Sequence, residues 1–315
     1  MEETKDGEPR STIKIAADGD VILVVGPKAV ELRVHSLFLK VASKPFSAML
    51  GPDWKEGDEM IGRDGPVELP LPEDKAATME LICAIIHHRN ERIPSTLPAL
   101  NVLEIAVTAD KYDCIDALKF ASQSWFCPDG HDTDDLMFLT ASAYLFRNAQ
   151  AFKEITKAMI LSHSGPYLAL SCEEVESVMS WKVFCHLEEA RNSARLELAD
   201  ILLKGVNDPT VHCVHKCGWS SKYAYAYLKS LEGQQLWPTH LYRTSISKAL
   251  ESAEKMSDPV PKESSVSCTY GYKHRTPEYR RNRCWSLEQL NNSIGLCLHC
   301  VRSGSASASS CRVTH

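Results

Sequence analysis

The sequence lacks long apolar runs and an excess of positive charge. No stretch of about 18 consecutive apolar residues occurs in the 315-residue chain, which excludes the usual signature of a membrane-spanning helix. The N-terminal segment MEETKDGEPRSTIK is charged and has no apolar core of the kind found in secretory signals. We therefore expect a cytoplasmic and/or nuclear protein without a membrane partner. The net charge of -6 makes nucleic acid an unfavoured partner for the molecule as a whole.

Complete catalytic motifs are also missing from the sequence. The chain contains no G-x-S-x-G nucleophile turn, no H-E-x-x-H zinc helix and no H-x-E pattern followed by P-C-x-x-C. A histidine near an acidic residue is weak support for general-base chemistry when no nucleophile motif accompanies it. We therefore expect a protein that is not an enzyme, with no catalytic residues and no organic cofactor.

Cysteine, by contrast, is plentiful. The chain has 12 cysteines, and without a secretory signal buried thiols or a metal site explain them better than disulfides do. Several cysteines stand singly among apolar residues, where a free thiol behaves as a small hydrophobic side chain. We predict buried positions for these, namely Cys83, Cys114, Cys127, Cys172 and Cys185.

The first third of the chain mixes strand-like and helix-like patterns. After Asp20, residues 21–25 form an apolar run of strand length that is closed by Gly-Pro, and residues 30–34 alternate apolar and polar side chains. The periodicity changes abruptly at His35, after which Ser36 and Ser43 stand where they can cap two short helices. Later segments predict a third strand followed by helices, namely PVELPLPED, KAATMELICAIIHHR and NVLEIAVTADKYDCIDAL. One compact α+β unit follows.

Five motifs in this region occur in a recognisable order: D-V-I-L-V-V-G, V-H-S-L-F-L, S-K-P-F-S-A-M-L, V-E-L-P and A-D-K-Y-D. With them, residues 15–122 resemble a BTB/POZ domain. The resemblance implies a short three-stranded sheet with helices that binds other proteins and catalyses no reaction. It also implies that Asp20 and His35 lie close together and fix the corner between a strand and the first helix.

The resemblance implies protein partners of two kinds. Some family members form homodimers through the first helix and an N-terminal strand, whereas others offer the loop after the third helix to a cullin-type ubiquitin-ligase scaffold. The corresponding segment here, IIHHRNERIPS, lacks the apolar-x-Glu pattern that anchors a cullin, so a cullin scaffold is only weakly supported. We predict an adaptor that self-associates or recruits partners, with a ligase substrate receptor as one alternative.

The middle of the chain, residues 130–206, reads as a helical extension. Its segments carry apolar side chains at helical spacing: DTDDLMFLTASAYLFRN, AFKEITKAMILS and WKVFCHLEEARNSARLELADILLKG. Acidic residues at the start of the first segment suit a helix N-terminus. We interpret the apolar stripes as core.

Residues 207–303 form a Cys/His-rich module with helices between its clusters. Zinc takes four ligands in a tetrahedron, and a C-x2-C turn such as Cys297 to Cys300 supplies two thiolates. Cys213 with His215 or Cys217 supplies the other half, which would join the two ends of the module through a structural Zn²⁺. Cys268, together with His274 and Cys284, belongs to the same site or to a second one. The candidate metal ligands are therefore Cys213, His215, Cys217, Cys268, Cys297 and Cys300.

The C-terminal stretch, residues 261–315, is basic on an acidic molecule. Its segment YKHRTPEYRRNRCW interleaves aromatic and positive side chains, which makes a nuclear nucleic-acid-binding regulator a further alternative. Residues 304–315 are rich in serine, and we predict a disordered tail there. The L-W-P and G-L-C-L-x-C signatures also resemble uncharacterised fungal BTB proteins with a Cys/His-containing tail. The positive residues are Lys262, Lys273, Arg275, Arg280, Arg281, Arg283, Arg302 and Arg312.

Overall fold

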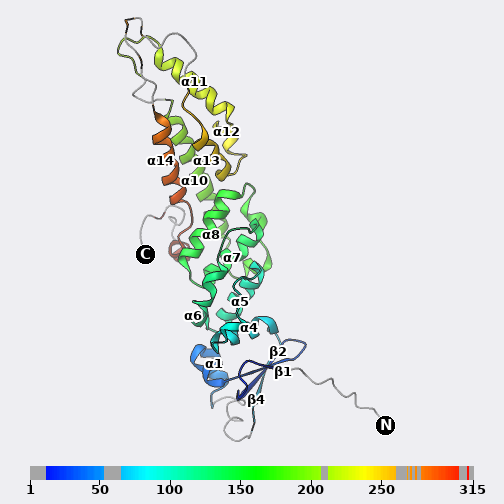
Figure 1. Cartoon of the computed structure of the whole chain (residues 1–315). Coiled ribbons are helices and arrows are strands. Elements are labelled where there is room, and N and C mark those ends of the chain that lie inside the picture. The colour runs from blue at the N-terminus through cyan, green and yellow to red at the C-terminus, as the bar shows by residue number, and fades with distance from the viewer. Residues whose placement is uncertain are drawn as a thin grey trace. The chain divides into compact units, whose positions relative to one another are not determined.

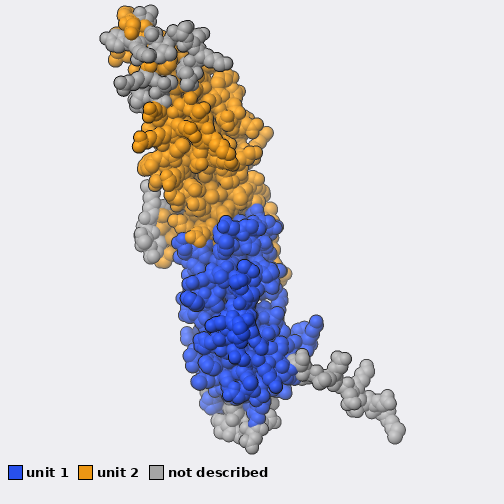
Figure 2. Space-filling model, in the orientation of Figure 1, with its two compact units in different colours: residues 1–151 blue, residues 152–315 orange. Residues whose placement is uncertain are grey.

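The protein divides into two compact units, residues 1–151 and 152–315 (Figure 2). The division falls inside the predicted helical extension. The computed structural model describes residues 12–52, 65–206, 212–259, 268, 270–271, 274, 278–304 and 311. Most of the predicted tail lies outside the described residues. Within the described ranges, no helix combines the length and the apolar character needed to cross a membrane.

The first unit contains a small four-stranded sheet in the order β1-β3-β2-β4 (Figure 1). Strands β2 (Val21–Val25) and β3 (Val30–Val34) form an antiparallel pair, as two adjacent strands with a short turn should. Strand β4 (Val67–Leu71) lies parallel to β2, and β1 (Thr12–Lys14) lies parallel to β3. The predicted α+β class is confirmed. The predicted three-stranded sheet was one strand short, because β1 is only three residues long and carries no periodicity of its own.

Helices follow the strands and share their core. They are α1 (Ser36–Ala42), α2 (Lys44–Met49), α4 (Ala76–Ile86), η1 (Asn90–Arg92), α5 (Ala99–Lys111), α6 (Ile115–Leu118), η2 (Ala121–Trp125) and α7 (Thr133–Leu145). Apolar alternation in β2 leaves Val21, Leu23 and Val25 fully buried, and helix α4 packs on β3 and on α1. Helices α5 and α7 pack against each other farther along the chain.

Hydrogen bonds to Asp20 fix the corner between β3 and α1. The Asp20 carboxylate accepts a 2.7 Å bond from the Ser36 backbone N–H and a 2.6 Å bond from the Ser36 hydroxyl. The Asp20 carboxylate thus caps the N-terminus of α1 from outside the helix. The sequence had predicted that the side chain of Ser36 would be the cap. His35 adds a second tie, because its backbone N–H donates to Nε2 of His87 at 2.9 Å. The His35 ring meets the exposed carboxylate of Asp18 at 3.1 Å.

The end of α5 is tied back to the sheet through Tyr112. Its ring stacks on Phe46 of α2, with ring centroids 4.5 Å apart. Its hydroxyl donates to Asp74 at 2.6 Å, and Lys111 donates to the other oxygen of Asp74 at 2.8 Å. Ser43 caps α2 as predicted, by accepting from the backbone N–H of Phe46 at 3.1 Å. The K-Y pair of the A-D-K-Y-D motif therefore fastens helices to the loop after β4.

The second unit is helical in the residues that the structure describes. The boundary between the units falls inside α8 (Ala149–Ser162). The later elements are η3 (Tyr167–Leu170), α9 (Glu173–Glu176), α10 (Lys182–Lys204), α11 (Trp219–Gly233), α12 (Pro238–Leu241), α13 (Ile246–Lys255), α14 (Tyr279–Ser293) and α15 (Leu298–Ser303). Helix α10 packs with α13 and α14, and its buried side chains match the predicted apolar stripe.

Arg283 on α14 is fully buried in the second unit. Its guanidinium donates to the carbonyl oxygens of Ala253 and Met256 at the end of α13, the first of these bonds being 3.0 Å long. Asp258 lies 3.4 Å away and balances the charge. Tyr279 is buried too. These two members of the basic aromatic stretch are therefore used for packing and are not exposed to a phosphate backbone.

The five isolated cysteines divide between core and surface. Cys83 and Cys114 are buried, and burial raises the pKa of both thiols, to about 12 for Cys114. Cys172 is half-buried, whereas Cys127 and Cys185 are exposed. The prediction of a buried position was wrong for the exposed pair, since apolar sequence neighbours on a helix or turn need not share a cysteine's face.

Replacing Asp20 with alanine should destabilise the first unit by about 1–2 kcal/mol, the usual cost of losing a cap. Burial raises the pKa of the Asp20 carboxyl, but the hydrogen bonds from Ser36 lower it more, and the net shift is downward. The stabilisation is therefore present above the unfolded-state pKa of about 4 and is lost as the pH falls through the lower folded-state value.

Hydrogen exchange of the β2 and α1 amides in the full chain measures this effect. Asp18→Ala is the matched control, because it removes the exposed partner of His35 and leaves the Asp20 bonds intact. Equal exchange rates in wild type and Asp20→Ala at neutral pH would show that the carboxylate does not hold the corner.

Candidate metal centre

Cys213 and Cys217 lie on a tight turn directly before α11. The backbone N–H of Lys216 donates to the carbonyl of Cys213 at 3.0 Å and closes the turn. Lys216 and Gly218 both adopt left-handed backbone conformations, with φ of 50° and 82°. Gly218 is suited to this conformation because it has no Cβ. The reversal brings the two thiols to the same side of the chain.

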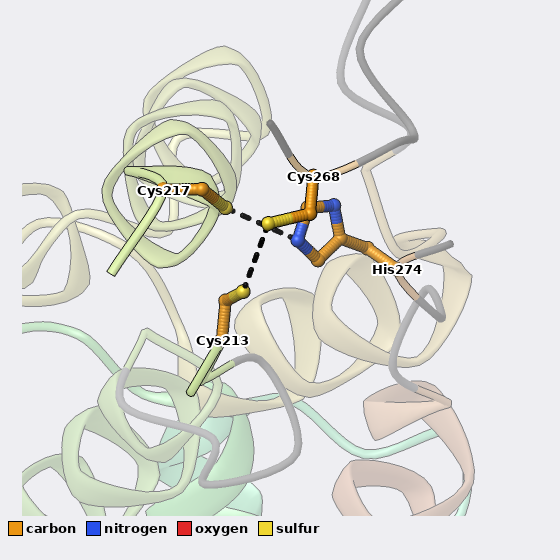
Figure 3. Close-up of side chains that lie close together, drawn as sticks. All are labelled: Cys213, Cys217, Cys268 and His274. Carbon is orange, nitrogen blue, oxygen red and sulfur yellow. Dashed lines mark hydrogen bonds between the residues drawn. The ribbon is translucent and has the colours of Figure 1, made fainter. Parts of the chain in front are cut away.

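Two further donors reach the turn from the segment between α13 and α14. Figure 3 shows the side chains of Cys213, Cys217, Cys268 and His274 pointing toward one another. Their four ligand atoms all lie within 4.8 Å of one another. Cys213 and Cys268 are 55 positions apart in the sequence, so the cluster joins distant parts of the second unit. We call these four residues the thiol–imidazole group.

The spacing of the thiol–imidazole group is close to that of a zinc tetrahedron. The sulfurs of Cys213 and Cys268 are 3.7 Å apart. Two thiolates on one zinc ion lie about 3.8 Å apart when each bond is about 2.3 Å long. The separation of 3.1 Å between Cys217 Sγ and His274 Nε2 is shorter than the roughly 3.5 Å of a coordinated pair. The sulfurs of Cys213 and Cys268 are too far apart for a disulfide, in which they lie about 2.05 Å apart.

The ring of His274 is held by an aromatic neighbour. It stacks on Trp219, the first residue of α11, with ring centroids 4.8 Å apart and planes 4° from parallel. Trp219 is itself only 5% exposed, so the stack is fixed against the second unit. Among the described residues, Nδ1 of His274 is buried and has no hydrogen-bond partner. The stack on Trp219 orients the imidazole, and its Nε2 lies 3.1 Å from the sulfur of Cys217.

Electrostatics in the thiol–imidazole group favour a thiolate. The hydrogen bond with His274, followed by the backbone N–H of His215, lowers the pKa of the Cys213 thiol to about 6. The backbone N–H of Tyr270 lowers the pKa of Cys268, but burial and the neighbouring thiols raise it more. Adjacent thiols thus share their protons unequally. One of them is ionised near neutral pH, and the thiolate is the form that binds a metal.

A second group of donors lies at the end of the chain. The sulfurs of Cys297, Cys300 and Cys311 all lie within 4.8 Å of one another. Cys300 is buried, and the other two are half-buried. We call these three residues the three-thiol group. Each group presents soft ligands at close range, so either set of side chains can hold a metal ion.

The structure therefore distributes the six predicted ligands differently from the single predicted site. Cys213, Cys217 and Cys268 meet in the thiol–imidazole group, whereas Cys297 and Cys300 belong to the three-thiol group. The expected junction between the two ends of the module is not present among the described residues.

His215 belongs to neither group, because its ring stacks on Tyr270 at 4.7 Å. His274, which was weighed as a secondary ligand, takes the fourth position instead, and Cys284 joins neither group. Sequence reasoning missed Cys311. The sequence feature that could have identified Cys311 is its C-x10-C spacing from Cys300, within a serine-rich tail.

Comparison of the chain with protein-family models, with curated proteins and with solved structures finds no match.

Proposed function

We propose that this chain is a non-catalytic adaptor for protein–protein interaction. In this proposal the first unit is a BTB/POZ domain that self-associates, and the second unit is a platform closed by structural zinc. The observation that carries the proposal is the apolar outer face of α1. Leu37 is 67% exposed, Phe38 is 38% exposed and Val41 is 81% exposed on this short helix.

The contacts of the first unit are consistent with the BTB/POZ resemblance. Its motifs fall on the antiparallel β2–β3 pair, on the corner at Ser36 and on the parallel strand β4. The A-D-K-Y-D segment supplies Lys111 and Tyr112, which both bond to Asp74. Each of these motifs therefore has a packing role here, which supports reading His35 and its neighbours as structural residues.

The face of α1 is well suited to protein contact. Leu37 and Val41 are four residues apart and so share one side of the helix, with Phe38 beside them. A cluster of large exposed apolar side chains on a folded surface marks an interaction site. The corner at Asp20 fixes the orientation of α1, so the surface is rigid before binding, which lowers the entropy cost of association.

We assign a second copy of the chain as the partner of this surface. A two-fold dimer brings the same patch of each copy together, so one apolar helix face suffices for both sides of the interface. The BTB/POZ resemblance supports this choice, because members of that family dimerise through the first helix. β1 lies at the edge of the sheet, where it pairs with β3 on one side.

Light scattering coupled to size exclusion on the full chain tests the self-association. The wild type should elute as a dimer, and Leu37→Glu with Val41→Glu should shift it to a monomer, because each glutamate places a charge in an apolar contact. Leu196→Glu on α10 is a matched control, because Leu196 is also an exposed leucine. A wild type that stays monomeric at high concentration would exclude the dimer.

For the thiol–imidazole group we propose a structural Zn²⁺. Three thiolates and one imidazole are a common ligand set for a closed zinc site, and they leave no position open for a substrate. The ligands come from both sides of the α11–α13 segment, so bound zinc would close this segment into a loop. Zinc binding in such a site contributes directly to folding, because the ligands are dispersed in the unfolded chain.

The two histidines near this group allow a sharp test. His274→Ala should lower the zinc content of the purified chain by one ion per molecule, because it removes a ligand of the closed site. His215→Ala is the matched control, and it should keep the wild-type content because the His215 ring stacks on Tyr270.

Mass spectrometry of the native protein measures the zinc content. Chelation should lower the melting temperature of wild type and of His215→Ala more than that of His274→Ala. The assignment of the ligands would be wrong if the two variants lost equal amounts of zinc.

A further inference from the structure

We propose that the three-thiol group, Cys297, Cys300 and Cys311, binds a second zinc ion. The chain would then carry two structural zinc ions, one at each ligand group. This inference concerns residues outside the thiol–imidazole group and does not rest on the adaptor function. It rests on two thiols on a fixed turn, on a third thiol within 4.8 Å of both, and on the chemistry of the donors.

The turn that carries the first two thiols is anchored to α8. The backbone N–H of Leu296 donates to the hydroxyl of Thr156 at 3.0 Å, and Leu296 is fully buried. Gly295 has a φ of 125°, and a Cβ added there would meet the carbonyl oxygen of Lys153 at 2.7 Å. Glycine is therefore required at this close approach. These contacts hold the turn in place before any ligand binds.

The local chain direction then brings Cys297 and Cys300 together. Cys297 precedes α15, and the backbone N–H of Val301 donates to its carbonyl at 3.0 Å. The start of the helix turns the chain back, so the sulfur of Cys300 lies within 4.8 Å of that of Cys297. Leu298, which stands between them in the sequence, is buried and holds the turn against the unit. The C-x2-C pair is therefore presented by a rigid support, as a zinc-binding turn requires.

Cys311 completes a set of three. It stands eleven positions after Cys300, yet its sulfur lies within 4.8 Å of both other sulfurs. A soft cation can bind all three as thiolates, and its charge removes the repulsion that would otherwise separate them.

The sequence spacing favours zinc as the cation. The three cysteines follow one another at C-x2-C-x10-C spacing, and a C-x2-C turn is a usual half of a structural zinc site. The thiol–imidazole group has the related order C-x3-C followed by C-x5-H. Thiolates are common ligands of structural zinc, and copper(I) and iron–sulfur clusters also take them. We assign zinc to this group, because the thiol–imidazole group of the same unit has the spacing of a zinc site.

The second ion would stabilise a different part of the second unit from the first. Figure 1 shows the start of α11, next to the thiol–imidazole group, and the end of α14, next to the three-thiol group, at opposite ends of the second unit. The three-thiol group would fasten Cys311 to the α14–α15 corner and, through Thr156, to α8.

Zinc stoichiometry of the full-length chain, purified under reducing conditions, tests the proposal. We expect two zinc ions per chain in the wild type, one in Cys311→Ser, one in His274→Ala and none in the double variant. Cys185→Ser is the matched control, because Cys185 is an exposed cysteine outside both groups, and it should retain two. Retention of both ions in Cys311→Ser would overturn the second site. One ion in the wild type that is lost in His274→Ala and kept in Cys311→Ser would overturn it as well.

Cadmium NMR of the wild-type chain gives a readout that does not depend on a variant that folds. Two resonances in the region of thiolate-rich coordination are expected, and a single resonance would contradict the second site. Three thiols that bind no metal under reducing conditions would overturn the site as a whole.

Discussion

The hydrogen bonds between the Asp20 carboxylate and Ser36 set the geometry on which the first unit depends. A small sheet must pass directly into a layer of helices, and the first helix begins with backbone N–H groups that need an acceptor. Asp20, the residue directly before β2, supplies the acceptor, which fixes the direction of α1 relative to β3. The apolar side chains of α1 then have a defined outward direction, and the proposed adaptor function depends on that direction.

The second unit differs from the first in containing two groups of metal-ligand side chains. Its thiol–imidazole group gathers side chains that are far apart in the sequence, since Cys213 and Cys268 are separated by 55 positions. Stacking of His274 on Trp219 and anchoring of Leu296 on Thr156 show that both groups rest on well-packed support. A metal ion on such a support would add a cross-link between segments that the hydrophobic core does not join directly.

Local patterns predicted the elements well, and long-range contacts limited the prediction of the site. Alternation in residues 21–25 and 30–34 reports directly on a buried strand face, so β2 and β3 were found from the sequence. The three-residue β1 exists only because β3 offers it a partner. Long-range contacts also decide which histidine joins the thiols. His274 stacks on Trp219 beside the thiols, whereas His215 stacks on Tyr270. The spacing of residues in the sequence does not predict these ring contacts.

The buried position of Arg283 changes how the charge of the C-terminal segment should be counted. Its guanidinium is satisfied internally by two carbonyl oxygens and by Asp258, so it holds no mobile ions from the surrounding solution. A polyanion that approached this face would displace counterions only from side chains that remain in water. The formal charge of the segment therefore overestimates the positive charge that a polyanion would meet. One of its cations, Arg283, instead stabilises the end of α13 from inside the unit.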